Sequence, residues 1–310
     1  MFRLNDVILL MVVLVSMLGG ILFPGFGSVF RHYPLYCLMI LLFLSFLSIE
    51  IKAIWDTLKY SIVKIICLTI LKIILLPIAI YYVFSVIAPS YAVAALLLSG
   101  ISTGVVAPFI SNLVKGNSSL VMVMVVVTSV LIPFTLPALI KVILGQSVNI
   151  PFSDMVRMLA LVVFIPFLVA ECLRKLAPPV LPIIMKVRFT VSLILFAIVN
   201  LGIFSRYADF FYREPMAIIT ATSTAIVLSV IYCAVGIACM FKKPIGDQLA
   251  GAITLGNMNN VLIIVFASRF FGPLEPTVAA IYILPFFALL IPLRMYYNWY
   301  TRSVISNEHK

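Results

Sequence analysis

Apolar runs of about twenty residues recur along almost the whole chain, and this is the length that a helix needs to cross a bilayer. Proline, glycine and charged residues separate the runs. The pattern predicts ten helical segments, at residues 7–23, 35–50, 61–86, 91–114, 119–144, 153–173, 187–205, 215–240, 245–270 and 274–297. Because ten spans with short connections use up the 310 residues, no soluble domain fits beside them.

Composition agrees with this pattern and excludes several classes of protein. Hydrophobic residues make up 64% of the chain and charged residues 10%, whereas soluble domains have about 45–50% and about 25%. A cytosolic enzyme, a secreted disulfide scaffold and a disordered chain are therefore excluded. The fold class that follows is an all-α membrane protein.

The ten spans divide into two halves of five, residues 1–150 and 151–310. Because each half has an odd number of spans, the halves run in opposite directions through the bilayer, as in many secondary transporters. Hydropathy alone therefore predicts two inverted five-helix repeats.

The formal net charge is +11, yet the basic residues flank the apolar segments and form no patch for a nucleic acid. Fourteen Lys and Arg lie at the termini and in the connections that follow even-numbered spans, and six lie in the other connections. Cytoplasmic loops carry an excess of these residues. The bias predicts a multi-pass protein of the inner or plasma membrane, with both termini in the cytoplasm.

The five cysteines are Cys37, Cys67, Cys172, Cys233 and Cys239, and no two of them form a Cys-x-x-Cys pair. All lie in apolar stretches, where an unpaired cysteine usually behaves as a small apolar side chain. We therefore expect neither disulfides nor a metal site formed by cysteines, and no cofactor.

Two spans contain polar interruptions, and each is the fourth span of its half. The first, from Ser99 to Pro108, holds two glycines, three hydroxyl side chains and a proline, which removes a helical hydrogen bond. The second, from Gly251 to Asn260, holds two glycines and three asparagines. Helix packing through small residues is the alternative explanation. Interruptions at corresponding positions favour a transporter substrate site, because unwound backbone exposes N–H and C=O groups near the midplane.

Lys72 is the one charged residue near the middle of a predicted span, about 17 Å along the third segment. A charge at this depth costs about 2.5–3.5 kcal/mol on insertion scales, so such residues usually mark function. The acidic residues all lie near span ends or in loops. A bound anion or the oxygens of the interrupted spans can satisfy the ammonium, and a purely structural tie to backbone carbonyls is the alternative. Lys64 and Arg157 lie near span ends, where long side chains extend to the interface.

Further motifs accompany the interruptions. After Gly100 and Gly104 comes Leu113-Val114-Lys115-Gly116-Asn117, and Pro133 follows Gly116 by seventeen residues. The second interruption contains Gly256-Asn257-Met258-Asn259-Asn260. The second segment ends in Leu44-Ser45-Phe46-Leu47-Ser48-Ile49-Glu50, and the third contains Pro77. Together these motifs resemble the bile acid:sodium symporter family over most of the chain, the second interruption being similar to its Glu-x-Gly-Met-Gln-Asn signature.

The resemblance implies ten helices in two inverted repeats, with a panel domain and a core domain in which the two broken helices cross. It also implies uptake of organic anions, such as bile acids, keto acids or vitamin precursors, driven by two sodium ions. Most sodium ligands of the family are absent here, because they fall on Ala107-Pro108, Val121, Val125 and Leu255. Only Asn259 and Asn260 keep amides, as weak candidates for sodium ligands.

The family's third-span glutamine falls on Lys72. In the family, two sodium ions and one glutamate leave the loaded site at +1, and one lysine without a glutamate has the same charge here. We therefore hypothesise that the Lys72 ammonium replaces a sodium ion, and that it contacts carbonyls around Gly256 and Asn257 and the amides of Asn259 or Asn260. The coupling ion stays open between sodium and a proton.

The sequence thus predicts a secondary transporter that carries a small organic anion across the lipid bilayer by alternating access. A transport-inactive sensor or partner subunit, and a channel-like facilitator, are the alternatives. An enzyme is disfavoured, because His32 and His309 lie outside the spans and no carboxylate lies at depth. The candidate substrate-binding residues belong to the third, fourth, fifth and ninth spans; they are Lys72, Thr103, Pro108, Ser111, Asn112, Thr128, Ser129, Asn257, Asn259 and Asn260.

Overall fold

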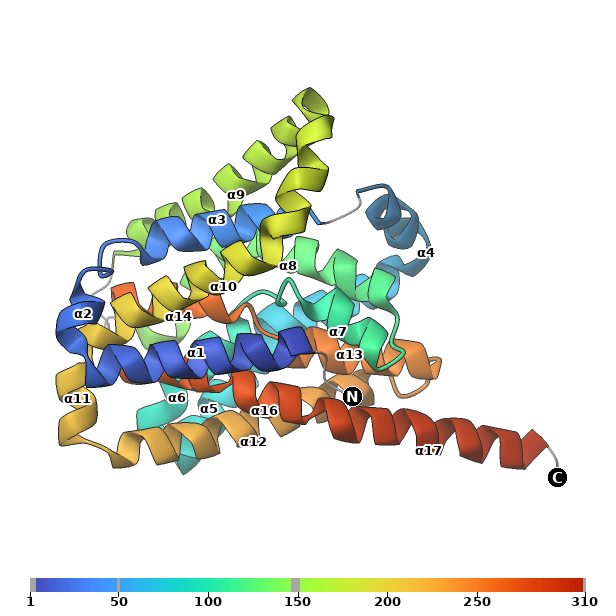
Figure 1. Ribbon diagram of the computed structural model, residues 1–310. Coiled ribbons are helices and arrows are strands. Elements are labelled where there is room, and N and C mark those ends of the chain that lie inside the picture. Colours follow the sequence, from blue (N-terminus) through green and yellow to red (C-terminus); the bar gives the residue numbers. More distant parts are fainter. Residues whose placement is uncertain (1–3, 49–50, 146–150, 309–310) are drawn as a thin grey trace. The chain divides into compact units, whose positions relative to one another are not determined.

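The computed structural model describes residues 4–48, 51–145 and 151–308 (Figure 1). Within these ranges the regular structure is helical, apart from one isolated β-bridge, so the all-α fold class is confirmed. Residues 146–150, which precede the predicted boundary between the repeats, lie outside the described residues. So do Arg3, Ile49, Glu50 and Lys310, which entered the charge count or the motif at the end of the second segment.

Every predicted segment contains helix. The first half of the chain has α1 (Leu4–Leu22), α2 (Pro24–Ser28), α3 (Pro34–Phe46), α4 (Ile51–Ile70), the π-helical η1 (Leu71–Leu75), α5 (Leu76–Ile87), the 3-10 helix η2 (Pro89–Tyr91), α6 (Ala92–Gly100), α7 (Ala107–Leu113) and α8 (Ser118–Leu144). The second half has α9 (Phe152–Leu176), the 3-10 helix η4 (Pro178–Val180), α10 (Leu181–Arg206), α11 (Ala208–Arg213), α12 (Met216–Cys239), α13 (Ile245–Gly256), α14 (Asn260–Phe270), α15 (Leu274–Ile281), α16 (Ile283–Ala288) and α17 (Leu290–Glu308).

Six helical stretches of the described chain are long and apolar enough to cross a membrane: Thr57–Ile87, Ser118–Leu144, Phe152–Leu176, Pro178–Arg206, Met216–Cys239 and Leu274–Arg302. Four shorter apolar helices accompany them: Met11–Leu22, Pro34–Phe46, Pro89–Gly100 and Asn260–Phe270. The protein is therefore a multi-pass membrane protein. Ten crossings, the inverted repeats and the cytoplasmic termini stay predictions.

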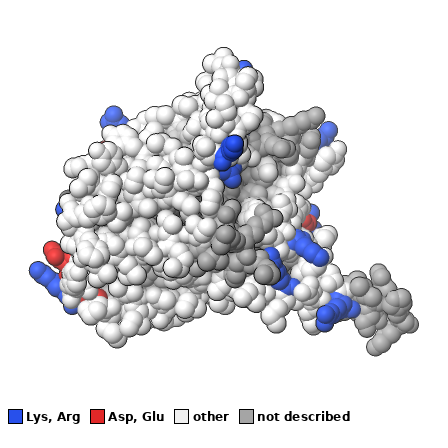
Figure 2. Space-filling model, in the orientation of Figure 1, with Lys and Arg blue, Asp and Glu red and all other residues white. Residues whose placement is uncertain are grey.

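The surface has the character expected of a chain in lipid. On the face drawn in Figure 2, Lys, Arg, Asp and Glu are few, and most of the described surface is uncharged. Large apolar side chains such as Val63, Val86 and Leu176 are more than three-quarters exposed, at 77%, 84% and 83%. A lipid environment removes the penalty that water would impose on this exposure.

The chain folds into two compact units, each assembled from separate parts of the sequence. Unit 1 contains residues 1–49, 133–221 and 260–280. In it, α1 lies along α10, and α3 packs against both α9 and α10 (Figure 1). A buried amide supports the pairing of α1 with α10, because Asn200 donates hydrogen bonds to the Ser16 hydroxyl and the Val13 carbonyl at 3.1 and 3.3 Å.

Unit 2 contains residues 50–132, 222–259 and 281–310. Its helices α4, α7 and α17 all contact α13. Gly236 of α12 packs directly on Gly251 of α13, because a Cβ atom at either glycine would collide with the carbonyl oxygen of the other. All predicted site residues except Asn260 belong to this unit.

The third span changes its helical geometry twice before it reaches Pro77. Ser61 has non-helical dihedral angles, φ −128° and ψ 19°, so α4 kinks where the apolar run begins. Residues 71–75 then form a single π-helical turn, a local widening that occurs often at functional sites. Pro77 follows in the first turn of α5. Lys72 lies inside this π-helical turn.

Two thiols in unit 2 give a direct test of its packing. The sulfur atoms of Cys67 on α4 and Cys239 at the end of α12 are 3.7 Å apart, and both are free thiols. We expect the short thiol cross-linker dibromobimane to join them within one chain, because the reagent spans only neighbouring thiols. Mass spectrometry of digested protein should find the Cys67–Cys239 cross-link. Its absence in protein whose two thiols both react with a monofunctional maleimide would contradict the packing of α4 on α12.

Candidate functional site

Both predicted helix interruptions are present in unit 2, and they contact each other. Helix α6 ends at Gly100 and α7 begins at Ala107, while α13 ends at Gly256 and α14 begins at Asn260. Thr103 and Met258 form an antiparallel bridge. The Gly104 amide donates to the Asn257 carbonyl at 2.9 Å, and the Asn259 amide donates to the Ser102 carbonyl at 3.0 Å. We call the paired segments, residues 101–106 and 257–259, the crossing.

The last turn of α13 is held by four different donors. A helix leaves its final carbonyl groups without partners inside the helix, so they need other donors when they are buried. The Asn257 amide donates to Ile253 O at 2.8 Å, and the Thr103 hydroxyl to Thr254 O at 3.0 Å. Lys72 donates to Leu255 O at 3.3 Å, and the Tyr282 hydroxyl to Gly256 O at 2.6 Å. The end of the half-helix is therefore fully satisfied within unit 2.

Lys72 is the only charged donor of these four, and it is completely buried, at 0% exposure. Its ammonium also contacts the Met258 sulfur at 2.6 Å and lies 6.0 Å from the centre of the Tyr232 ring. A cation at a helix C-terminus is stabilised by the partial negative charge of the last carbonyls. Among the described residues, no carboxylate is within ion-pair distance of Lys72. The ammonium thus meets the second interruption as expected, but at Leu255 O and the Met258 side chain.

Thr128 of α8 supports the first interruption. Its hydroxyl accepts a hydrogen bond from the Thr103 amide at 3.0 Å and donates one to the Met124 carbonyl of its own helix at 2.7 Å. The unwound segment would otherwise leave the Thr103 amide without a partner in a buried place. The Thr128 hydroxyl therefore stabilises the extended backbone of the crossing at Thr103.

Several oxygen atoms of unit 2 are buried and have no hydrogen-bond partner among the described residues. They are Ser102 Oγ, Ser111 Oγ, Ser129 Oγ, Tyr232 Oη, Thr254 Oγ1 and Asn257 Oδ1. Ser102, Thr254 and Asn257 lie on the crossing or in the helical turn before it, and Ser129 is the neighbour of Thr128 in sequence. Buried polar groups without partners are few in native proteins, so these oxygens are candidates for contact with a ligand or ordered water.

The remaining candidates from the sequence lie farther along the two broken helices. Pro108 lies in the first turn of α7, where its missing N–H costs nothing, and it is partly exposed. Ser111 is buried beside Gly116, whereas Asn112 on the same helix is exposed. Asn259 is buried within the crossing. Asn260 begins α14 and belongs to unit 1.

Sequence reasoning missed Tyr282, Tyr232 and the side chain of Met258. Tyr282 and Tyr232 are fully buried, and their rings lie 6.0 Å apart. Nothing in the sequence marks them, because tyrosine in an apolar run is also typical of a lipid interface. The sequence also indicated no partner for Lys64, whose ammonium pairs with Asp247 of α13.

The Tyr282 hydroxyl gives a prediction for stability. Replacing Tyr282 with Phe keeps the ring and leaves Gly256 O without its donor, so we expect a loss of about 1–3 kcal/mol. A lower melting temperature in detergent, read from intrinsic fluorescence, checks this. Tyr60→Phe is the matched control, because Tyr60 of the same unit is 82% exposed and should melt as the wild type does. Equal melting temperatures for Tyr282→Phe and the wild type would contradict the capping role.

Comparison with known proteins supplies the family. A search of curated proteins found no match for the chain. The model of the sodium bile acid symporter family matches residues 35–214, which is more than half of the 310 residues. The matched part includes Lys72, the first interruption and Thr128, and it ends before the second interruption. Since the members of this family are transporters, an enzymatic role is disfavoured at the level of the family. On this match, which agrees with the motifs around the crossing, the chain belongs to the sodium bile acid symporter family.

Proposed function

We propose that this protein is a secondary transporter that moves a small organic anion by alternating access at the crossing. The observation that carries the proposal is the Lys72 ammonium, which is fully buried and has no carboxylate partner among the described residues. Charged groups inside membrane-spanning segments usually face a cavity or a partner and mark the path of a substrate. Family membership supports transport as the activity.

The charge balance of unit 2 favours an anion as the substrate. Around the crossing the polar groups are neutral hydroxyls, amides and carbonyls, and in the described part of the chain Lys72 is the one cation that contacts them. A carboxylate entering this environment gains attraction from the ammonium and hydrogen bonds from hydroxyl groups such as those of Ser102 and Thr254. Substrate identity beyond a small organic anion does not follow from these groups.

Sodium fits this set of residues poorly. Sodium is a hard cation that needs oxygen ligands and usually an anionic one. The side chains of Val121, Val125 and Leu255 offer no oxygen. The acidic residue of α13, Asp247, lies at the opposite end of that helix and pairs with Lys64. We therefore propose that the Lys72 ammonium takes the place of a sodium ion and that transport does not depend on sodium.

The test is uptake into proteoliposomes of a panel of labelled organic acids, with sodium and pH gradients imposed separately. We expect saturable uptake of at least one anion, which a sodium gradient does not accelerate. The Lys72→Gln variant, which restores the glutamine that the family has here, is compared under the same gradients. If wild-type uptake requires sodium and Lys72→Gln behaves identically, Lys72 does not replace the ion.

The same assay separates the alternatives. A channel-like facilitator would give uptake that does not saturate and that no ion gradient can drive above equilibrium. A transport-inactive sensor would show no uptake of any acid. Saturable binding of an anion to the purified protein, lost in Lys72→Gln, would then identify the crossing as a sensing site.

A further inference from the structure

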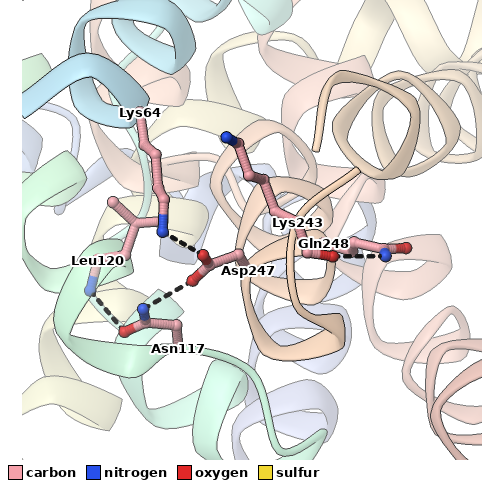
Figure 3. Close-up of polar contacts among 6 residues, drawn as sticks. All are labelled: Lys64, Asn117, Leu120, Lys243, Asp247 and Gln248. Carbon is pink, nitrogen blue, oxygen red and sulfur yellow. Dashed lines mark hydrogen bonds and ion pairs between the residues drawn. The ribbon is translucent and has the colours of Figure 1, made fainter. Parts of the chain in front are cut away.

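A second lysine of the third span binds α13 at its other end. The Lys64 ammonium forms an ion pair with the Asp247 carboxylate in the first turn of α13 (Figure 3). The Asp247 side chain is 6% exposed and that of Lys64 is 28% exposed, so the carboxylate is almost fully buried while the lysine retains some access to solvent. Since breaking a buried ion pair leaves an uncompensated charge, this contact restrains the two helices strongly.

The two lysine contacts have the same spacing on both helices. Lys64 and Lys72 are eight residues apart on the third span, and their partners Asp247 and Leu255 are eight residues apart on α13. Eight residues of α-helix rise about 12 Å. The third span therefore runs parallel to α13 and is fastened to it near the first turn and in the last turn.

Both contacts are favourable with respect to the dipole of α13. Asp247 lies at the N-terminal end, where a negative charge is favourable, and Lys72 lies at the C-terminal end, where a positive charge is favourable. Lys64 compensates the charge of Asp247, whereas Lys72 has no carboxylate among the described residues. The paired end is therefore a neutral anchor, whereas the other end carries the Lys72 amine without a carboxylate beside it among the described residues.

Two neighbouring side chains fix the anchored end to the rest of unit 2. Asn117 donates to the second oxygen of Asp247 at 2.8 Å, and its own side-chain oxygen accepts the Leu120 amide at the start of α8 (Figure 3). Gln248 donates to the Phe241 and Lys243 carbonyls at 3.0 and 2.9 Å and accepts the Tyr296 hydroxyl at 2.6 Å. The first turn of α13 is thereby tied to α8, to the turn after α12 and to α17.

We propose that Asp247 is a positioning residue for transport: with Lys64 and Asn117 it fixes the register of α13 against the third span, and so places the last carbonyls of α13 at the Lys72 ammonium. The inference rests on the proposed function, because it assigns the anchored end of α13 to the support of that site. Without the anchor, α13 slides or tilts along the third span and the contact between Lys72 and Leu255 O weakens.

A thermodynamic cycle tests this coupling without using transport. Melting temperatures in detergent are compared for the wild type, Asp247→Asn, Lys72→Gln and the double variant. Sites more than about 10 Å apart without shared partners normally have additive effects. If Asp247 positions the contact of Lys72, the shift caused by Lys72→Gln should fall to less than half in the Asp247→Asn background. Additive shifts would overturn the proposal.

Two further variants make the cycle decisive. Lys64→Gln breaks the same ion pair from its more exposed partner, so it replaces Asp247→Asn if that variant does not fold. Tyr296→Phe removes the hydrogen bond to Gln248 without touching the ion pair, and its shift should add to that of Lys72→Gln. If Tyr296→Phe reduces the melting shift of Lys72→Gln as much as Asp247→Asn does, the effect is a general loosening of α13. That result would also overturn the proposal.

Uptake measured on the same variants separates this inference from the proposed function. We expect Asp247→Asn to lower the maximal uptake rate about tenfold, and Lys64→Arg, which keeps the ion pair, to retain it. If the melting shifts are coupled but the protein transports none of the acids, the role of Asp247 in the register of α13 is supported and the proposed function is contradicted. If the melting shifts are additive but uptake depends on Lys72, the proposed transport function is supported and the positioning role of Asp247 is contradicted.

Discussion

Replacing Lys72 with methionine should lower the initial rate of anion uptake at least about a hundredfold. Methionine has a similar length and no charge, so the variant removes the Lys72 ammonium from the crossing and leaves Leu255 O without its donor. Two unit charges about 4 Å apart attract by about 4 kcal/mol at an effective dielectric constant of about 20, which corresponds to about a thousandfold in binding. Uptake of the labelled acid into proteoliposomes, at matched protein content, measures the effect.

Lys59→Met is the control for this substitution. Lys59 lies in the same helical stretch as Lys72, Thr57–Ile87, is exposed and has no part in the crossing, so its replacement should leave uptake near the wild-type rate. Lys72→Arg asks whether the charge suffices, because a guanidinium group keeps the charge in a larger, planar form. Wild-type uptake by Lys72→Met would show that the ammonium does not recruit the anion.

Replacing Gly104 with alanine should destabilise the protein by about 3 kcal/mol and abolish uptake. A Cβ atom at this position would collide with the side-chain oxygen of Asn257 and would lie 2.6 Å from the Met258 carbonyl oxygen. The two interruptions therefore have to separate, which breaks the hydrogen bond from the Gly104 amide to the Asn257 carbonyl. We expect a lower melting temperature in detergent and no saturable uptake in proteoliposomes.

Gly246→Ala is the matched control for Gly104→Ala. Its Cβ atom would meet the Asn117 amide and the Lys115 carbonyl at 3.7 Å, which is an ordinary contact distance. The melting temperature and uptake of this variant should stay close to those of the wild type. If Gly104→Ala melts and transports as Gly246→Ala does, the two interruptions are not held together as described.

The positions of the helix interruptions could be predicted from sequence because their causes are local. Proline cannot donate a backbone hydrogen bond and glycine costs helical stability, so both residues act wherever the rest of the chain places them. Pro108 does lie in the first turn of α7, and Gly256 does end α13. The small-residue packing that competed as an explanation fails for Gly104, which lies in extended backbone against Asn257 and Met258.

The partners of Lys72 could be predicted only in part. Its depth followed from counting residues along an apolar run, and a contact with the second interruption followed from the family resemblance. The acceptor itself is a backbone carbonyl, Leu255 O. Every residue has such a carbonyl, so the residue type at position 255 does not indicate this contact. Tyr282 escaped prediction for the same reason, because its hydroxyl serves the carbonyl of Gly256.

The pair of Lys64 and Asp247 shows where counting along the chain misleads. Each residue lies near the end of a predicted span, where a charged side chain is normally solvated. They are 183 residues apart in sequence, and nothing in either segment shows that α4 and α13 lie side by side. The structure joins them and adds Asn117, whose place in the Lys115-Gly116-Asn117 motif gave the only signal.

The amino-acid sequence by itself determined that this protein lies in a membrane, that its helices break at two polar interruptions and that one lysine enters the apolar interior. These properties depend on composition and on the local effects of glycine, proline and charge, which act over a few residues. Tertiary structure decided which carbonyl accepts the Lys72 ammonium, which residues anchor α13 and how distant segments combine into two compact units. Those outcomes depend on packing between helices far apart in sequence, where backbone atoms do much of the bonding.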